Sequence, residues 1–319
     1  MSKTYCVIGA GGCGGSIAAY MAKAGFDVTL IARGEHLEQI KECGLTMETP
    51  HLGTFTVSQI KAVEAEEYEQ TPNVMFVCVK EYSLPEIMPF LKKHCGVHTI
   101  VIPILNIYGT GSRLQNELPD SLVTDGCIYI AAEKKAPGCL QQKGSIFRIV
   151  YGVREPERLC KEIFEIAEDL RKSGIDARIS DNIARDAFLK YSYISPMAAC
   201  GLYFDAKAEV FQQACDQRQF LTECMEEIAD LADAMELGLL VDVVKTNLEI
   251  LDALSPEAST SMQRDIWAGK PSEIDGLVFE PVRLAKKYGV KMPKYEMIAR
   301  RFRDDLNIEF IENVSYSSL

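Results

Sequence analysis

Three glycines near the amino terminus carry the first chemical signal. Gly9, Gly11 and Gly14 lie within VIGAGGCGGSIA and match the pattern G-x-G-x-x-G. The apolar run before them predicts a strand and the small residues after them predict a helix, which is the context that makes this pattern informative. Gly9 permits a tight turn, Gly11 lets the main chain approach a pyrophosphate, and Gly14 lets helix and strand pack closely. The loop therefore predicts a dinucleotide site at a helix N-terminus, with a merely tight strand–helix turn as the alternative.

The end of the next predicted strand bears on which dinucleotide binds. The strand DVTLIA is followed by Arg33. An arginine at this distance from the glycines suits the 2′-phosphate of NADP, because its charge is permanent and its donors are planar. Glu35, two residues further on, would suit the free ribose hydroxyl of NAD. The sequence favours NADPH/NADP, with a solvated surface cation as the other interpretation of Arg33.

A nicotinamide enzyme that reduces a carbonyl needs a proton donor for the developing alkoxide. All four histidines precede the helical second half of the chain, so none can come from it. Tyr203 and Lys207 have the Y-x-x-x-K spacing of short-chain dehydrogenases, whose glycine pattern is spaced differently. Lys190, in RDAFLKYSYIS, lies among apolar residues that could desolvate its ammonium and ease release of a proton. The alternative is a lysine whose ammonium reaches water along its own methylenes.

The elements that must position these residues change in kind along the chain. The first half alternates strands and helices, and VMFVCVK and TIVIPIL are the near-continuous apolar runs typical of parallel strands buried on both faces. We therefore predict a Rossmann-like, doubly wound α/β domain over residues 1–180. Residues 119–152 predict further strands, antiparallel, at one edge of the sheet. Residues 181–319 have a helical period and predict an all-α substrate and catalytic domain, with one long amphipathic helix over 209–238.

Composition excludes several classes of partner. The chain has 319 residues, is 47% hydrophobic and carries a net charge of −12, which argues against nucleic acid and anionic membrane surfaces. The 11 cysteines lack metal-ligand spacing, and they indicate a reducing, cytoplasmic location without a metal. Neither a signal peptide nor an apolar run long enough to span a membrane is expected. The amphipathic helices fit a homodimer and a buried core equally well.

Several segments together resemble the ketopantoate reductase (2-dehydropantoate 2-reductase) family, and the resemblance covers nearly the whole chain. They are GAGGCGGSIA, LIARGEHLEQIKECGLTM, VCVKEY, PGCLQQKGSIFRIVYG, the lysine in AFLKY, SMQRDIWAGKPSEIDG and YGVKMP. The most specific is S-M-x-x-D-I followed at fixed distance by E-I-D-G. The resemblance implies an N-terminal Rossmann domain, a helical C-terminal domain and NADPH-dependent reduction of a 2-keto acid, often in pantothenate biosynthesis.

The resemblance also implies which residues bind the cofactor. The three glycines would hold the pyrophosphate and Arg33 the 2′-phosphate. Lys80, at the end of MFVCVK, would reach the ribose or the reaction centre. Asn106 matches the asparagine of the family's Q-N-G turn, near the nicotinamide. Glu273 would hydrogen-bond cofactor and substrate groups.

For the substrate, the resemblance implies that Lys190 is the general acid, that Ser261 binds the keto acid and that Glu273 takes part in catalysis. A lysine at the carbonyl oxygen can stabilise negative charge and then release its proton. Glu273 would tune and orient that lysine. Ordinary helix-start chemistry is the alternative for both Ser261 and Glu273.

The sequence departs from the family at positions that would contact the substrate. Asparagines usually lie four and eight residues after the lysine, where this chain has Ile194 and Ala198, and the Q-N-G turn has Leu105 in place of glutamine. Apolar side chains cannot replace amide hydrogen bonds. Either the substrate is a more apolar 2-keto acid, or a local register shift supplies Ser192 or Ser195 instead.

The sequence thus predicts reduction of a 2-keto acid to a 2-hydroxy acid, with 2-dehydropantoate as the favoured substrate. Two alternatives stay open. One is a regulatory protein that binds NADP without catalysis. The other is a related dehydrogenase that acts on a different 2-keto acid.

Overall fold

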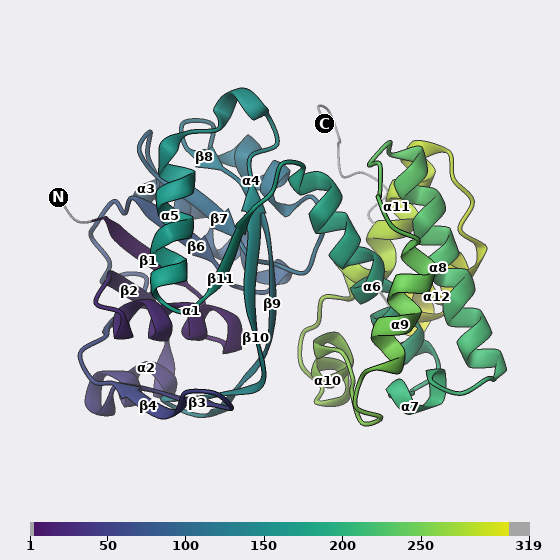
Figure 1. The fold of residues 1–319 in the computed structure, drawn as a ribbon, viewed down its shortest axis with the longest axis horizontal. Coiled ribbons are helices and arrows are strands. Elements are labelled where there is room, and N and C mark those ends of the chain that lie inside the picture. Colours follow the sequence, from purple (N-terminus) through teal and green to yellow (C-terminus); the bar gives the residue numbers. More distant parts are fainter. Residues whose placement is uncertain (1–2, 306–319) are drawn as a thin grey trace. The chain divides into compact units, whose positions relative to one another are not determined.

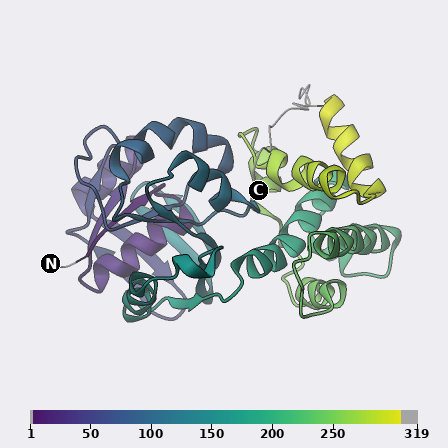
Figure 2. The same ribbon diagram turned by 90° about the horizontal axis from the view of Figure 1, so that it is seen from above.

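The chain mixes strands and helices as far as β11 (Asp176–Ile179), and the described residues after it form helices and their connections. The computed structural model describes residues 3–305 (Figure 1). The chain divides after Ala187 into two compact units. The first holds the sheets, and the described part of the second consists of helices and their connections (Figure 2). This confirms the predicted α/β domain followed by an all-α region.

The first unit is built on a six-stranded parallel sheet with the order β5-β2-β1-β6-β7-β8. Its strands are β1 (Thr4–Ile8), β2 (Asp27–Ile31), β5 (Lys61–Val63), β6 (Val74–Val77), β7 (Ile100–Pro103) and β8 (Leu122–Val123). The strand order reverses between β1 and β6, which is the switch point at which open α/β sheets bind ligands. The helices of this unit are α1 (Gly12–Lys23), α2 (Gly34–Cys43), α3 (Leu84–His94), α4 (Thr110–Glu117) and α5 (Lys161–Lys172), with short 3₁₀ turns at Glu81–Ser83 and Pro156–Arg158.

The central strand β1 shows why its sequence is continuously apolar. Tyr5 and Val7 enter one buried cluster, whereas Cys6 and Ile8 enter another. Since neighbouring side chains of a strand point to opposite faces, these are the two faces of the sheet. The sheet is therefore covered on both sides, as the apolar runs predict.

A second, five-stranded sheet corrects the interpretation of residues 119–152. Its strands are β3 (Leu45–Thr49), β4 (Gly53–Val57), β9 (Asp125–Ala136), β10 (Cys139–Gly152) and β11. β9 and β10 are antiparallel, as expected, but they form a separate sheet with the order β11-β10-β3-β4. Only β8 extends the edge of the parallel sheet. The expected edge placement was wrong because β10 pairs with β3 and β11, two strands that the hydrophobic pattern did not reveal.

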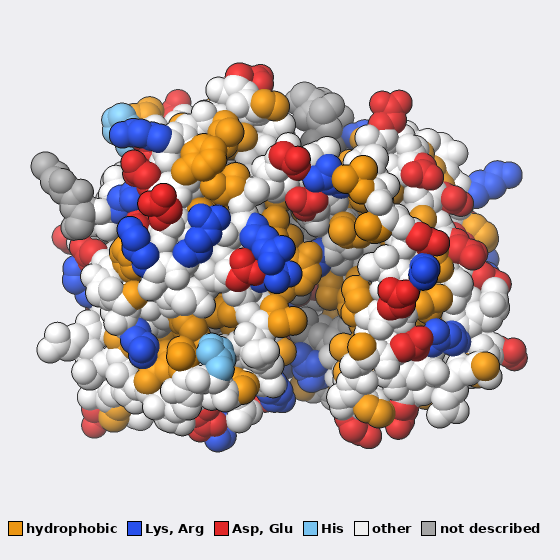
Figure 3. All heavy atoms as spheres, in the orientation of Figure 1, with side chains coloured by type: hydrophobic (Ala, Val, Ile, Leu, Met, Phe, Trp, Pro, Cys, Tyr) orange, Lys and Arg blue, Asp and Glu red, His pale blue; other side chains and the backbone are white. Residues whose placement is uncertain are grey.

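The second unit contains α6 (Ile183–Tyr203), which crosses the division, α7 (Ala208–Phe211), α8 (Asp216–Ala234), α9 (Val243–Asp252), α10 (Ser261–Trp267), the π-helix Asp275–Phe279, α11 (Glu280–Tyr288) and α12 (Pro293–Asp305). Among residues 3–305, no helix has both the length and the apolar character needed to cross a membrane. On the face drawn in Figure 3, acidic and basic side chains are interspersed.

The single helix expected over residues 209–238 is two helices. The chain breaks at Cys215, whose extended backbone (φ −152°, ψ 170°) makes it the N-cap of α8. Arg218 donates to the Phe211 carbonyl at 2.7 Å, and Gln212 donates to the carbonyls of α9 and the turn after it. Side-chain hydrogen bonds therefore replace the helical backbone bonds that the amphipathic pattern alone would predict.

Candidate active site

Two of the five clustered glycines are required by the close approach of helix and strand. Gly9 follows β1 with φ +103°, a conformation that favours glycine. A Cβ on Gly9 would lie 2.7 Å from the Cys78 carbonyl oxygen, and one on Gly14 would lie 2.1 Å from the Gly9 carbonyl oxygen. Neither position can hold a side chain without displacing backbone.

Two further glycines serve the second sheet. A Cβ on Gly12 would lie 2.2 Å from the Ala132 carbonyl oxygen of β9, and one on Gly15 would lie 2.4 Å from the Leu140 side chain of β10. Small residues here let α1 pack directly on that sheet. Neither is one of the three glycines that the G-x-G-x-x-G pattern requires.

Gly11 differs from the other four. Its backbone is ordinary (φ −76°, ψ −171°), and apart from Gly11 and its two chain neighbours no atom of the described residues lies within 4 Å of where a Cβ would be. It is also the N-cap of α1, so no side chain caps the first turn of that helix. The packing of the protein therefore does not explain why residue 11 is glycine, whereas a diphosphate lying against this main chain would.

His36 holds the glycine loop in place, a role that the motif did not reveal. Its Nδ1 accepts from the Gly138 N–H at 2.9 Å, so the ring proton is on Nε2, which donates to the Ala10 carbonyl at 2.9 Å. The ring is buried, and burial lowers its pKa below the ordinary value. A neutral histidine thus ties the loop after β1 to the turn between β9 and β10.

The other predicted cofactor residues all follow strands of the parallel sheet. Arg33 lies just beyond β2 as the N-cap of α2, Lys80 lies beyond β6, and Asn106 lies beyond β7. Parallel strands end at one edge, so the topology brings these residues to the same edge as the glycine loop. Arg33 is 82% exposed and contacts Glu86 at 3.2 Å, whereas Lys80 and Asn106 are half-buried. An exposed ion pair of this kind restrains Arg33 only weakly.

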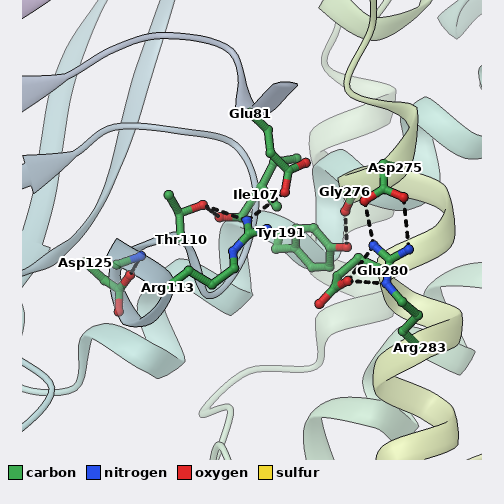
Figure 4. Close-up of polar contacts among 11 residues, drawn as sticks. Glu81, Ile107, Thr110, Arg113, Asp125, Tyr191, Asp275, Gly276, Glu280 and Arg283 are labelled. Atoms are coloured by element: carbon green, nitrogen blue, oxygen red, sulfur yellow. Dashed lines mark hydrogen bonds and ion pairs between the residues drawn. The ribbon is translucent and has the colours of Figure 1, made fainter. Parts of the chain in front are cut away.

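An ion pair joins the segments that carry Lys80 and Asn106. Glu81, directly after Lys80, pairs with Arg113 of α4 at 2.7 Å, and its carboxylate is only 12% exposed (Figure 4). α4 begins after Gly109, whose φ of +76° completes the turn that follows Asn106. No sequence pattern predicts a role for Arg113, because its contact with Glu81 depends on the pairing of β6 with β7.

In the second unit, α6 carries the predicted general acid. Lys190 is half-buried, between Leu189 and the fully enclosed Tyr191. Ile194, one turn further along, is also half-buried, and Ala198 is buried. The role of Lys190 as general acid stays a prediction.

The two serines considered as replacements for the missing asparagines are engaged elsewhere. Ser192 donates to the Leu189 carbonyl at 2.7 Å, and Ser195 donates to the Leu277 carbonyl at 2.8 Å. Both side chains have no exposed surface. The suggested register shift is therefore wrong, because α6 holds both hydroxyls within the packed helices.

The remaining predicted residues lie at the starts of helical segments. Thr260, not Ser261, is the N-cap of α10, where it forms a capping box with Gln263, so capping does not account for Ser261. Glu273 is 3% exposed, and its carbonyl accepts from the Leu277 N–H at 3.1 Å where the π-helix begins. Among residues 3–305, no cluster of His, Cys, Asp and Glu is arranged to hold a metal ion.

A parallel sheet with a glycine loop at its switch point, followed by an α-helical unit, defines a Rossmann-class α/β protein. The family model described as "Ketopantoate reductase PanE/ApbA" matches residues 5–156, and its C-terminal counterpart matches residues 182–304. The chain belongs to the ketopantoate reductase family, whose members are oxidoreductases.

Individual relatives agree with the family assignment. The chain is 21% identical over 308 residues to a 2-dehydropantoate 2-reductase from Nostoc sp., covering 94% of each chain. It is similar to the crystal structure of 2-dehydropantoate 2-reductase from Porphyromonas gingivalis, with a TM-score of 0.80, 27% identity and coverage of 95% and 99%. D-mandelate dehydrogenase, in a ternary structure with NADH and anilino(oxo)acetate, has the same fold at 22% identity (TM-score 0.84; coverage 96% and 100%).

Proposed function

We propose that this protein uses NADPH to reduce a 2-keto acid to a 2-hydroxy acid, with 2-dehydropantoate as the favoured substrate, in the cytoplasm and as a homodimer. The observation that carries the proposal is Gly11, a glycine that packing does not require at the uncapped start of α1. Membership in a family of oxidoreductases supports the reaction type.

The cofactor side of the proposal assigns one task to each residue at the sheet edge. The main chain at Gly11 binds the pyrophosphate at the start of α1. Arg33 binds the 2′-phosphate, which its permanent charge and exposed position suit. Lys80 binds the ribose side, and Asn106 orients the nicotinamide. The dinucleotide, when bound, supplies the hydride.

The substrate side assigns the proton. Lys190 donates a proton to the keto oxygen as negative charge develops there, so hydride and proton together give the 2-hydroxy group. Glu273, a buried carboxylate, orients the lysine and accepts hydrogen bonds from substrate and cofactor hydroxyls. Ser261 hydrogen-bonds the substrate.

A second candidate is a reductase for a more apolar 2-keto acid. Ile194 is half-buried on the helix of Lys190, and Ser192 and Ser195 make other hydrogen bonds. A site without polar partners for a substrate hydroxyl discriminates poorly in favour of it. D-mandelate dehydrogenase, which is named for an aromatic hydroxy acid, has the same fold.

The test is a panel of 2-keto acids offered to the purified protein with NADPH, followed by loss of the reduced-nicotinamide absorbance. Highest kcat/KM with 2-dehydropantoate supports the first candidate, and highest kcat/KM with phenylglyoxylate or a branched-chain keto acid supports the second. Faster turnover with NADH than with NADPH would overturn the role of Arg33. Tight NADPH binding without oxidation by any member would favour the regulatory interpretation.

A further inference from the structure

The π-helix ends beside a residue that cannot donate a backbone hydrogen bond. An α-helix would offer the N–H of residue 281 to the Leu277 carbonyl, and a π-helix would offer it to the Gly276 carbonyl. Residue 281 is proline, which has no N–H. The Glu280 N–H, the preceding donor, goes to Asp275. A donor from another element is therefore needed at this point.

Helix α6 supplies hydroxyl donors to both carbonyls. The Tyr191 hydroxyl donates to the Gly276 carbonyl at 2.7 Å (Figure 4), and the Ser195 hydroxyl donates to the Leu277 carbonyl at 2.8 Å. Because Ser195 has a single hydroxyl proton, its contact with Tyr295 at 2.7 Å must have the tyrosine as donor. Tyr191 and Ser195 are four residues apart, so they lie on one face of α6.

Arg283 braces the same π-helix at both ends. It donates twice to the Asp275 carboxylate, at 2.9 and 2.7 Å, and once to Glu280 at 2.7 Å (Figure 4). Asp275 is the first residue of the π-helix, and Glu280 directly follows its last. Burial lowers the pKa of Arg283, but the two carboxylates raise it by more. The guanidinium therefore stays charged and links the two ends of the π-helix through Asp275 and Glu280.

These contacts join the segments that carry the two proposed catalytic groups. Lys190 directly precedes Tyr191 on α6, and Glu273 lies two residues before the π-helix. One residue added to a helix rotates what precedes it by about 100° around the axis, so the π-helix sets how the Glu273 segment is presented relative to α11. We infer that Tyr191, Ser195 and Arg283 are positioning residues that fix the helix of Lys190 against the turn of Glu273. This inference rests on the proposed function.

The test compares two serines of one helix. Ser195→Ala removes a link to the π-helix, whereas Ser192→Ala removes an equally buried hydroxyl that bonds to the Leu189 carbonyl of α6 and to Asn247. Tyr191→Phe is the second test variant, since it keeps the ring. We would measure kcat against pH, KM for the keto acid, Kd for NADPH and thermal unfolding for each variant.

We expect Ser195→Ala and Tyr191→Phe to lower kcat by about 10- to 100-fold, because small misplacement of reacting groups has that cost. We also expect a shifted pH limb for the lysine and an unchanged NADPH Kd, while Ser192→Ala stays within about twofold of wild type in kcat. Equal kcat and pH profiles for the two serine variants in an active protein would overturn this inference alone. Failure of the wild type to turn over any 2-keto acid would overturn the proposed function and this inference with it.

Discussion

The glycine loop of the first unit and the π-helix of the second unit are specified by the sequence in different ways. In the loop, backbone atoms lie within 3 Å of an added Cβ at Gly9, Gly12 and Gly14, only the end of the Leu140 side chain does so at Gly15, and nothing crowds Gly11. In the helical unit, prolines lack a backbone N–H, and side chains of other helices donate to carbonyls near them. The glycine loop can therefore be recognised from the spacing of residues along the sequence, whereas the hydrogen bonds of the π-helix depend on which helices pack together.

In the second unit, this arrangement of a proline and a side-chain donor occurs at Pro196 and at Pro281. Pro196 lies within α6 and cannot donate to the Ser192 carbonyl, which accepts instead from the Asn247 side chain at 3.0 Å. Pro281 offers no N–H at the end of the π-helix, where the hydroxyls of Tyr191 and Ser195 donate to the carbonyls of Gly276 and Leu277. Buried carbonyls without partners are costly, so each donor is a requirement of the fold.

The largest predicted effect is a loss of turnover that leaves cofactor binding intact. Lys190→Ala should lower kcat by about 10²- to 10⁴-fold, because the developing alkoxide loses its proton donor. The Kd for NADPH should stay unchanged, since the glycine loop remains intact. Steady-state kinetics and fluorescence titration with NADPH measure the two constants. Unchanged turnover would remove Lys190 from the mechanism.

The loop itself is tested by two matched glycine variants. Gly14→Ala places a methyl group 2.1 Å from backbone and should destabilise the fold by about 1–3 kcal/mol or more. An alanine side chain at residue 11 meets no atom elsewhere in the described chain, so Gly11→Ala should lower the unfolding free energy by no more than about 1 kcal/mol, the cost of alanine at an N-cap, while NADPH binds at least about 10-fold more weakly. Denaturant unfolding and NADPH titration separate the two. Normal NADPH affinity in Gly11→Ala would show that the loop is only a tight turn.

The role of side-chain donors in the helical unit is tested by Asn247→Leu, which leaves the Ser192 carbonyl buried without the amide donor of Asn247. We expect a loss of about 1–3 kcal/mol in unfolding free energy. Adding Pro196→Ala restores a backbone N–H and should recover part of that loss. Denaturant melts of the single and double variants measure the difference. No recovery would mean that Asn247 stabilises the unit through packing instead.

The smallest predicted effect concerns His36 and pH. Burial lowers its pKa, so the folded state favours the neutral ring, while Lys134 also disfavours the charged form. Above the unfolded pKa of about 6.5 the neutral ring contributes its full stability. As the pH falls below that value, the unfolded chain takes up the proton first and the contribution is lost. The Tm advantage of wild type over His36→Gln should therefore shrink on acidification, and a constant difference would contradict this assignment.

Much of the first unit could be predicted from the sequence, because glycine spacing and apolar runs reflect the local conformation and burial of the chain. The parallel sheet, the loop and Arg33 at the end of β2 follow from such patterns. The second sheet could not be predicted, since β10 pairs with β3 across a long stretch of chain. Three other features depend on tertiary contacts that a hydrophobic pattern cannot predict. They are the break before α8, the hydrogen bonds of Ser192 and Ser195, and the ion pair between Arg113 and Glu81.

The central claim is that hydride passes from the dinucleotide to the keto carbon of an acid. The direct measurement is a reaction with NADPH deuterated at both C4 positions, followed by mass spectrometry of the hydroxy acid. We predict one deuterium, bound to C2 of the product. A product with no deuterium at C2, or no product from any 2-keto acid although NADPH binds, would contradict the account.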